Sequence, residues 1–354
     1  MDSGSQERSN RLTKVSSVEV TVPARLHLGF LDLEGGLGRR FGSIGLTIEG
    51  IETRLVAEPS AAITATGPSA ERAADFGRKI AAALGVPGAK LTVADAIPEH
   101  AGLGSGTQLG LAVGTAIARV YGCDAGARAI AMMLGRGERS GIGIGAFEQG
   151  GVLVDGGRRI EADGVPAPIV SRMEFPSAWR VFLIFDRASE GLHGEAETNA
   201  FRKLPPFAPQ TAAHLCRLVL MSALPALAEG DLPQFSAAIA EIQRTVGDHF
   251  APVQGGRYAS PRVAEVLAWL KDRDIVGLGQ SSWGPTGFAF LADAAAAEAL
   301  LAQARVKWAG DDRLRFMICW GRNQGGRVVA GNRPRPRATN AVAKFRTKSQ
   351  QSEM

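Results

Sequence analysis

Hydrophobic and polar residues alternate near the start of the chain, from Val18 to Phe30. Valine, alanine, leucine and phenylalanine fill the even-numbered positions, whereas Arg25 and His27 are among the polar residues at odd-numbered ones. Successive side chains of a strand point to opposite faces, so the pattern predicts a half-buried strand. Arg25 and His27 share its polar face, where they either contact a ligand or form the solvated face of an edge strand.

The remaining periodicities predict strands and helices in both halves of the chain. Apolar runs bounded by turn residues predict strands at 46–57, 90–94, 151–155, 180–185, around 275, 286–291 and 314–320. Helical spacing predicts helices at 71–84, 105–121, 126–134, 195–203, 209–227, 232–246, 261–271 and 294–303, with a glycine-rich turn between 134 and 151. This order predicts an α/β (α+β) protein with an N-terminal domain over 17–175 and a C-terminal domain over 176–330.

The composition indicates a folded chain, and the charge distribution argues against a nucleic-acid-binding body. The 354 residues are 45% hydrophobic and 21% charged, which allows a large core. The formal charge of +5 lies mainly in residues 331–354, which hold six basic residues and one acidic residue. The body is therefore close to neutral and has no electrostatic reason to bind nucleic acid. Residues 1–16 and 331–354 are polar, and we expect both to be disordered.

The sequence gives no sign of export or of a metal-binding cysteine pattern. Residues 1–16 lack the apolar core of a signal peptide, and no uninterrupted apolar run reaches the ~18 residues of a membrane helix. Cys123, Cys216 and Cys319 are widely separated and odd in number, unlike a zinc site or a disulfide framework. We expect a cytoplasmic protein with no membrane partner.

A glycine-rich loop precedes the helix predicted at 105–121. Such a loop can direct backbone N–H groups and a helix N-terminus at an anion. It is not a Walker loop, and Leu109 replaces the third glycine of the dinucleotide-binding pattern. Two interpretations stay open, a phosphate-binding loop and a structural turn in which Ser105 and Thr107 are helix caps. The candidate phosphate-binding residues are Gly102, Gly104, Ser105, Gly106, Thr107 and Gln108.

Three motifs occur in the order found in the GHMP superfamily of small-molecule kinases. Residues 98–105 resemble its Pro-x-x-x-Gly-Leu-Gly-Ser motif, residues 23–29 its first motif and residues 279–287 its C-terminal motif. The resemblance implies a two-domain GHMP-kinase-like fold, with an N-terminal α/β domain, a C-terminal ferredoxin-like domain and the site between them. From the third motif it implies further substrate-binding residues, namely Ser281, Ser282, Trp283 and Gly284.

One position departs from the kinase pattern. The kinases commonly carry Ser-Gly-x-Asp seven residues before a Gly-Gly pair, whereas this chain has Gly143 at the aspartate position. A glycine cannot take the proton of a substrate hydroxyl, so the usual base for phosphoryl transfer is missing. Either another group replaces the aspartate or the reaction is not phosphoryl transfer from ATP.

The motif details resemble one branch, the β-ribofuranosylaminobenzene 5′-phosphate synthases of tetrahydromethanopterin biosynthesis. The segments that carry this resemblance are 25–27, 102–109, 139–148, 191–195 and 280–286. It implies condensation of phosphoribosyl pyrophosphate with 4-aminobenzoate or 4-hydroxybenzoate, with release of CO2 and pyrophosphate. It also implies Mg²⁺ and a homodimer. The alternatives are an ATP-dependent sugar or alcohol kinase and, as the weakest, nucleic-acid binding by the basic tail.

Under this resemblance several polar residues become candidates for the site. Arg25 would hold an anion and His27 would contact substrate, and Glu148, His193 and Glu195 would handle protons or metal. Each also has an ordinary interpretation as a capping or solvated residue. The remaining candidates are Arg139, Ser140 and Gly141 for anions, Trp283 for stacking on the arene, and Asp32 as a metal or ribose ligand or else a turn residue.

Overall fold

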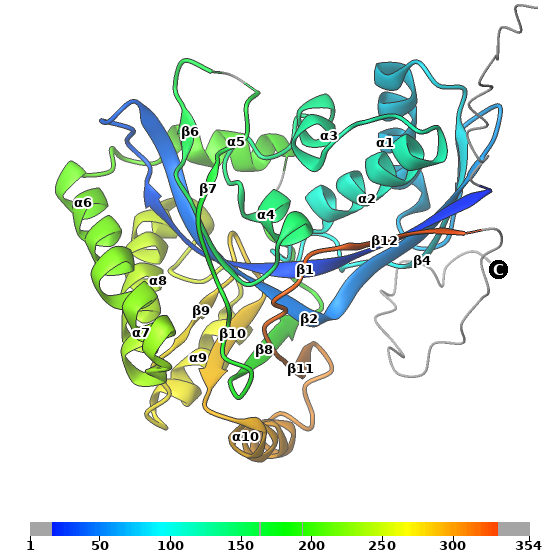
Figure 1. The fold of residues 1–354 in the computed structure, drawn as a ribbon. Helices are drawn as coiled ribbons and strands as arrows, with labels where there is room; N and C mark the ends of the chain where they lie inside the picture. Colours follow the sequence, from blue (N-terminus) through cyan, green and yellow to red (C-terminus); the bar gives the residue numbers. More distant parts are fainter. Residues whose placement is uncertain (1–15, 163, 193, 332–354) are drawn as a thin grey trace, which may run out of the picture.

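The structure is a computed structural model that describes residues 16–162, 164–192 and 194–331. Figure 1 shows two sheets with helices packed around them. The predicted disordered ends and His193 lie outside the described residues, apart from Ser16 and Gly331.

The larger sheet contains eight strands and is built around a long hairpin of the first two. Its main path runs β12-β1-β2-β4-β3, while β5 and β6 pair with β2 and β7 pairs with β5. The predicted first strand is confirmed and its even-numbered apolar residues are buried, but the expectation that it is half-buried is wrong, because Thr21 and His27 of the other face are buried as well. The strands are β1 (Ser17–Asp32), β2 (Arg39–Pro59), β3 (Thr64–Thr66), β4 (Ala89–Asp95), β5 (Val152–Asp155), β6 (Arg158–Arg159), β7 (Ile169–Met173) and β12 (Arg327–Gly331).

Four helices accompany this sheet and bury a core between themselves and β1, β2 and β4. Its members include Val20, Leu55, Phe76 and Ile117. The helices are α1 (Ala70–Leu84), α2 (Ser105–Val120), α3 (Ala127–Met133) and α4 (Ile142–Glu148). The predicted turn between 134 and 151 is wrong, because it contains α4. The glycines of this helix are buried against other elements, so tertiary packing overrides their low helix propensity.

The smaller sheet belongs to the C-terminal part and has the order β11-β8-β10-β9, with antiparallel neighbours. The chain order strand, helices, two strands, helix, strand is that of a ferredoxin-like unit. The predicted strand near 275 begins three residues later. The strands are β8 (Arg180–Asp186), β9 (Leu278–Gln280), β10 (Gly287–Leu291) and β11 (Leu314–Cys319).

The C-terminal helices cover both the small sheet and part of the large one. They are α5 (Gly194–Lys203), α6 (Pro209–Leu218), the π-helical turn η1 (Val219–Ala223), α7 (Leu224–Glu229), α8 (Leu232–Gln254), α9 (Pro261–Lys271) and α10 (Ala294–Lys307). The predicted continuous helix over 209–227 is interrupted by η1. Pro225 cannot donate a backbone hydrogen bond just after this interruption.

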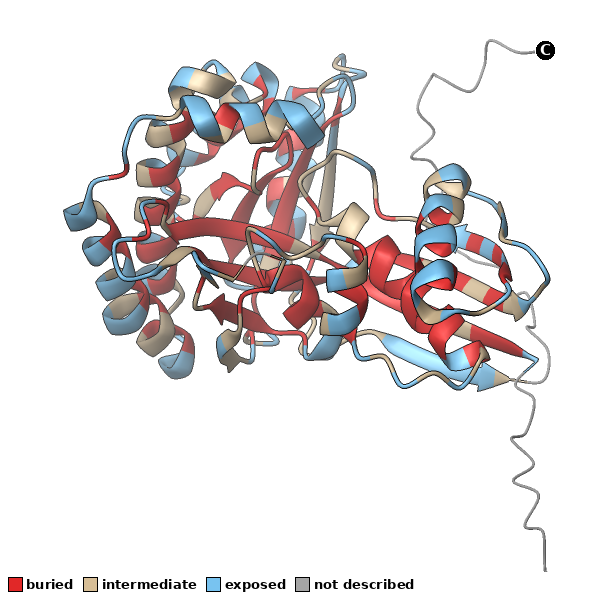
Figure 2. Ribbon diagram, turned by 90° about the horizontal axis from the view of Figure 1, so that it is seen from above, coloured by how far each residue is buried: buried red, intermediate tan, exposed pale blue. Residues whose placement is uncertain are grey.

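A single hydrophobic core joins the two predicted domains. It includes Leu26 of β1 and Leu46 of β2 together with Leu183 of β8 and Phe235 of α8. Figure 2 shows buried strands across the middle of the molecule with exposed helix faces outside them. The segment Pro209–Glu229 is long and apolar enough to cross a membrane by length and composition alone. Its Leu215 belongs to this core, whereas Leu220 and Met221 are exposed.

The end of the predicted C-terminal domain returns to the N-terminal sheet. Strand β12 pairs antiparallel with β1, with Ala330 opposite Val18. Strand β12 therefore belongs to the N-terminal sheet although it follows the boundary at residue 175. The sequence did not predict β12, because the strand is short and lies at an edge of the sheet.

Candidate active site

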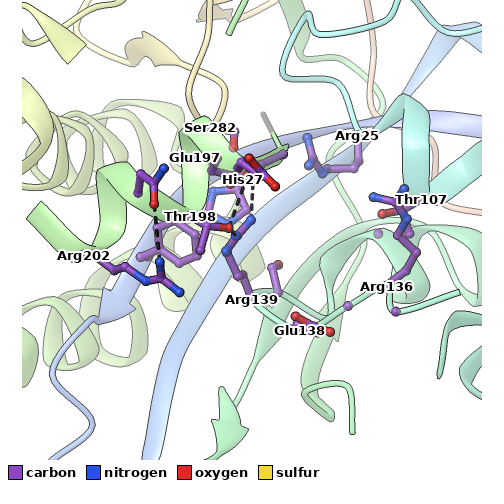
Figure 3. Close-up of a pocket in the computed structure, with 18 residues that line it drawn as sticks. Arg25, His27, Thr107, Arg136, Glu138, Arg139, Glu197, Thr198, Arg202 and Ser282 are labelled. Carbon is purple, nitrogen blue, oxygen red and sulfur yellow. Dashed lines mark hydrogen bonds and ion pairs between the residues drawn. The ribbon is translucent and has the colours of Figure 1, made fainter. Parts of the chain in front are cut away.

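A cavity of about 800 Å³ is lined by four parts of the chain. These are the part of β1 that holds Arg25 and His27, the start of α2, the segment before α4, and α5. Figure 3 shows its polar side chains, with Thr107 and Arg136 on one side and Arg202 on the other. Of the predicted site residues, those that line it are Arg25, His27, Thr107, Arg139, Ser140, Glu195 and Ser282.

The three sequence motifs meet beside this cavity through short polar contacts. Arg25 Nη1 donates to the Gly102 carbonyl at 2.5 Å, and Ser281 Oγ donates to the same oxygen at 2.7 Å. Ser281 Oγ also accepts from the His27 backbone N–H at 3.0 Å. Gly102 has φ of 75°, and any Cβ there would collide with the Ser281 carbonyl. Gly102 and Ser281 therefore hold the motifs together without lining the cavity themselves.

Arg25 and His27 provide a buried cation and a neutral imidazole. Burial lowers the pKa of Arg25 to about 10, and Glu197 partly offsets this, so the residue stays charged at neutral pH. Burial and, next, the charge of Arg25 lower the pKa of His27 to about 3, against a hydrogen bond of the ring to its own backbone. His27 is only 3% exposed, and its Nε2 has no hydrogen-bond partner among the described residues. No described residue therefore satisfies this nitrogen, and His27 is part of the cavity wall.

The glycine loop opens α2 without a side-chain cap. Gly104 is the N-cap residue with φ of 82°, and Ser105 begins the helix without capping it. A Cβ at Gly104 would lie 3.2 Å from Arg25 Nε, and a side chain at Gly106 would collide with Arg72. The uncapped end of α2 and these guanidiniums create a positive site for an anion. Gln108 is buried instead, and its Nε2 donates to the Gly143 carbonyl at 2.7 Å.

Arg136 strengthens the positive charge at this end of the cavity. Burial lowers its pKa, as does neighbouring Arg72, while Glu138 and Glu197 act in the opposite direction. Its Nε is buried without a hydrogen-bond partner among the described residues. The sequence signal for this residue was its position with Arg139 around a glycine-rich segment.

Gly143 lines the cavity at the position where the kinases carry aspartate. A Cβ there would lie 2.9 Å from Thr107 Cγ2. The structure therefore puts no carboxylate at this point, and α4 packs its backbone directly against Thr107.

A carboxylate instead enters the cavity from α5. Glu197 forms an ion pair of 2.7 Å with Arg139, whose Nη2 also donates to Thr198 Oγ1 at 2.9 Å. Burial raises the pKa of Glu197, while Arg139, the Trp283 indole and Arg25 lower it. Trp283 Nε1 itself forms no hydrogen bond with a described residue. Of the two acids in the first turn of this helix, Glu195 was the predicted site residue, whereas Glu197 is the one held by cavity cations.

Ser140 and Gly141 are tied to a buried carboxylate behind the cavity. Asp155 accepts from Ser140 Oγ at 3.1 Å, from the Gly141 N–H at 2.9 Å and from Ser43 Oγ at 2.5 Å. Asp155 is only 1% exposed. These bonds fix the start of α4, so Gly141 positions the site and Ser140 contributes only part of its surface.

The expectation that Trp283 stacks on an arene is wrong for this arrangement. The indole is 2% exposed and stacks on Phe250 with ring centroids 4.3 Å apart, while Phe201 meets it edge-on at 5.2 Å. Protein rings therefore occupy its surroundings. The adjacent Gly284 has φ of 72° and donates to the Ser281 carbonyl at 3.0 Å, which makes it part of the turn.

Two other predicted carboxylates lie away from the cavity. Glu148 is exposed at the end of α4 and does not line it. Asp32 Oδ1 accepts from the N–H groups of Glu34 and Gly35, each at 2.9 Å, which is a turn role. The described residues contain no group of three or more histidine, cysteine or acidic side chains arranged to hold a metal.

Comparison with known proteins agrees with the fold and the motifs. The GHMP kinases N terminal domain matches residues 70–151, and the GHMP kinases C terminal family matches residues 223–309. Mevalonate-3-kinase from Thermoplasma acidophilum superposes with a TM-score of 0.63 at 14% identity, covering 91% of this chain and 100% of the other. Homoserine kinase from Cytophaga hutchinsonii gives 0.59 at 14% identity, with coverages of 89% and 98%. These similarities establish the fold.

Sequence relatives are more specific. Beta-ribofuranosylphenol 5′-phosphate synthase from Archaeoglobus fulgidus is 35% identical over 285 residues, which cover 77% of this chain and 87% of the relative. The protein of the same name from Methanocaldococcus jannaschii is 34% identical, with coverages of 77% and 88%. The kinase interpretation is thus the weaker one, and this enzyme belongs to the β-ribofuranosylphenol 5′-phosphate synthase family.

Proposed function

We propose that this enzyme condenses phosphoribosyl pyrophosphate with 4-hydroxybenzoate or 4-aminobenzoate and releases pyrophosphate and CO2. The observation that carries the proposal is a cavity lined by arginines in which the kinase base position is Gly143. The printed name of the relatives, a ribofuranosylphenol 5′-phosphate synthase, supports the same product class.

The proposed chemistry explains why no base is required at Gly143. The C1–oxygen bond of the ribose breaks and its electron pair leaves with pyrophosphate. The ring carbon that bears the carboxylate forms the new bond to C1, and the carbon–carboxylate electron pair returns to the ring as CO2 departs. No proton of the ring has to be removed, whereas a kinase must remove one from a hydroxyl.

The residues around the cavity divide between the two charges of this reaction. Pyrophosphate gains negative charge as it leaves, and Arg25, Arg136, Thr107 and the start of α2 would stabilise it. The sugar gains positive charge at C1, which the carboxylate of Glu197, held by Arg139, would stabilise. The unpartnered His27 Nε2 would orient a ribose or arene hydroxyl.

We propose that Mg²⁺ enters with the pyrophosphate. Magnesium is commonly bound through one or two carboxylates and substrate phosphates rather than by a cage of protein ligands. Glu138 and Glu195 line the cavity, and neither forms an ion pair with another described residue. They would hold the metal, which neutralises phosphate charge. We also propose a cytoplasmic homodimer on the family resemblance, and sedimentation velocity measures the subunit number.

The test supplies purified enzyme with Mg²⁺, phosphoribosyl pyrophosphate and carboxyl-labelled 4-hydroxybenzoate or 4-aminobenzoate. We expect labelled CO2 and one equivalent of pyrophosphate, both dependent on phosphoribosyl pyrophosphate. ATP in place of phosphoribosyl pyrophosphate should give no product. ADP formation with a hydroxylated acceptor, without CO2 release, would instead establish the kinase alternative.

Arg25→Gln removes one positive charge from the cavity, and the same substitution at exposed Arg78 is its control. The variant should lower kcat/KM for phosphoribosyl pyrophosphate about a hundredfold, because it removes a buried charge-assisted contact. Arg78→Gln, on the exposed side of α1, should leave it unchanged.

A further inference from the structure

A second pocket opens from the side of the cavity. It has a volume of about 340 Å³ and is called here the arginine annex. Some residues line only the annex and not the cavity, namely Arg40, Phe41, Arg158 and Phe201. Others line both spaces, among them Arg139 and Arg202. A ligand could therefore occupy both spaces at once.

The annex is built from a locally unfavourable arrangement of two arginines. Arg40 of β2 and Arg158 of β6 are directly opposite each other in the paired strands. Like charges at such positions destabilise a sheet. Both guanidiniums lie over the ring of Phe41, at 5.4 and 5.9 Å from its centroid, and Phe41 itself has φ of 78°. A bulky residue rarely adopts this backbone conformation, and such strain occurs often at ligand sites.

Arg40 is fixed by a short hydrogen bond, whereas Arg202 is exposed with one long contact, and guanidiniums outnumber carboxylates in the lining. Arg40 Nε donates to the Leu33 carbonyl at 2.7 Å, and Arg202 Nη1 donates to Asn199 Oδ1 at 3.4 Å. Arg139 is partly neutralised by Glu197. Glu138 is the one carboxylate among the described residues that line the annex. The lining therefore carries more guanidiniums than carboxylates, which favours an anionic ligand.

The position of the annex identifies which anion of the reactants it suits. Arg202 lies on the opposite side of the cavity from Thr107 and Arg136 (Figure 3). In the condensation, pyrophosphate and the aryl carboxylate both start next to ribose C1. The 5′-phosphate is the anionic group remote from the reacting carbon, so it has to lie at a separate positive site.

We propose that the arginine annex binds the 5′-phosphate of phosphoribosyl pyrophosphate, a phosphate monoester dianion. This inference rests on the proposed function. Contacts to a remote, non-reacting group supply binding energy that positions C1 between pyrophosphate and arene.

The experiment measures binding of two fragments by calorimetry, ribose 5-phosphate and pyrophosphate with Mg²⁺, to the full-length enzyme. Arg202→Gln and Arg40→Gln should weaken ribose 5-phosphate about tenfold or more, since each removes a charge-assisted contact. Pyrophosphate affinity should change less than about twofold, because its site is on the glycine-loop side. Lys203→Gln and Arg159→Gln, which change exposed neighbours of Arg202 and Arg158, are the matched controls and should bind both fragments normally.

Each result distinguishes the annex from the proposed reaction. A wild-type enzyme that releases no CO2 contradicts the proposed function, whereas fragment binding is read without turnover. Unchanged ribose 5-phosphate affinity in Arg202→Gln overturns the annex proposal even if the enzyme is an active synthase. Weaker 4-hydroxybenzoate binding with normal ribose 5-phosphate binding also overturns it and assigns the annex to the aryl acid. Equal losses of affinity in the control variants would show a general effect of net charge and likewise overturn the annex proposal.

Arg202 is exposed on α5, so its variant tests the proposal even if Arg40→Gln fails to fold.

Discussion

His27 shows how burial selects the role of a single side chain. Its ring packs against Phe30 with centroids 4.4 Å apart, and its pKa of about 3 keeps the imidazole neutral at every pH where the protein is expected to work. A neutral ring can orient a substrate hydroxyl but cannot change charge between pH 5 and 8. We infer that His27 positions substrate rather than carrying a proton through the reaction.

The prediction for His27 concerns both activity and pH. His27→Ala should raise KM for phosphoribosyl pyrophosphate or arene about tenfold, and His27→Gln less, because an amide retains hydrogen-bonding atoms. Initial rates from pH 5.5 to 8 should show no ionisation near pH 6.5 that disappears in His27→Gln. An ionisation near pH 6.5 that is present in wild type and absent in His27→Gln would refute the positioning role.

The same pKa shift predicts a stability effect. An unfolded histidine takes up its proton near pH 6.5 and the buried one only near pH 3. The unfolded state therefore binds more protons in this window, and wild-type stability should fall as the pH falls through it. Urea unfolding at pH 7 and pH 4.5 should show a smaller decrease for His27→Gln than for wild type. An equal decrease would contradict the shift.

Gly143 is the residue at which the kinase and synthase interpretations differ most. In Gly143→Asp the new carboxylate would lie beside Thr107 in the space proposed for pyrophosphate, so we expect kcat/KM for phosphoribosyl pyrophosphate to fall at least about tenfold. No ATP-dependent phosphorylation should appear. Gly143→Ala, which adds only the Cβ near the Thr107 methyl, measures the steric part of the loss. Kinase activity in the aspartate variant would show that the rest of the kinase machinery is present in this site.

At the scale of elements, Asp186 joins three parts of the C-terminal sheet and its helices. It ends β8 and accepts from Ser260 Oγ, the N-cap of α9, at 2.7 Å and from Arg313 Nη2, just before β11, at 2.9 Å. Burial raises its pKa, but hydrogen bonds from Arg313, Ser189 and Ser260 outweigh this and hold it at about 2. The stabilisation is present above the unfolded pKa of 3.8 and is lost as pH falls towards 2.

Asp186→Asn should therefore lower the free energy of unfolding by about 2 kcal/mol at pH 7. The difference from wild type should narrow below pH 4, as measured by urea titration. Ser189→Ala removes one neutral donor and should cost less. If the difference in free energy of unfolding between wild type and Asp186→Asn did not change with pH, it would be due to packing and not to the carboxylate charge.

The sequence predicts elements best where one periodicity acts alone. Alternation located β1 and placed Arg25 and His27 on one face, and the glycine motifs located the loop before α2. The sequence did not locate α4, because Gly143 and Gly145 weaken its helix propensity and only contacts with Thr107 and Ile169 explain it. The annex was also missed, since the pairing of Arg40 with Arg158 depends on a two-residue strand that has no periodicity of its own.

At the scale of the whole molecule, β12 links the last described residues to the first strand. A chain ending at Gly326 would lose β12 and expose the edge of β1, so its free energy of unfolding should fall by about 2 to 4 kcal/mol. A chain ending at Gly331 retains β12 and should match full-length kinetics and stability. Chemical denaturation of both chains tests this, and equal stabilities would show that β12 contributes little.

The pairing of β12 with β1 has one more consequence. Ser17 is opposite Gly331 in the register, and Ser16 Oγ donates to the Gly331 carbonyl at 2.7 Å. The path of the backbone through the fold thus closes on itself, with the hydrogen bonds of a sheet in place of a peptide bond. A short linker across this junction would make a circular permutant that retains both sheets and the cavity, with new ends cut into an exposed loop such as the one around Gly230.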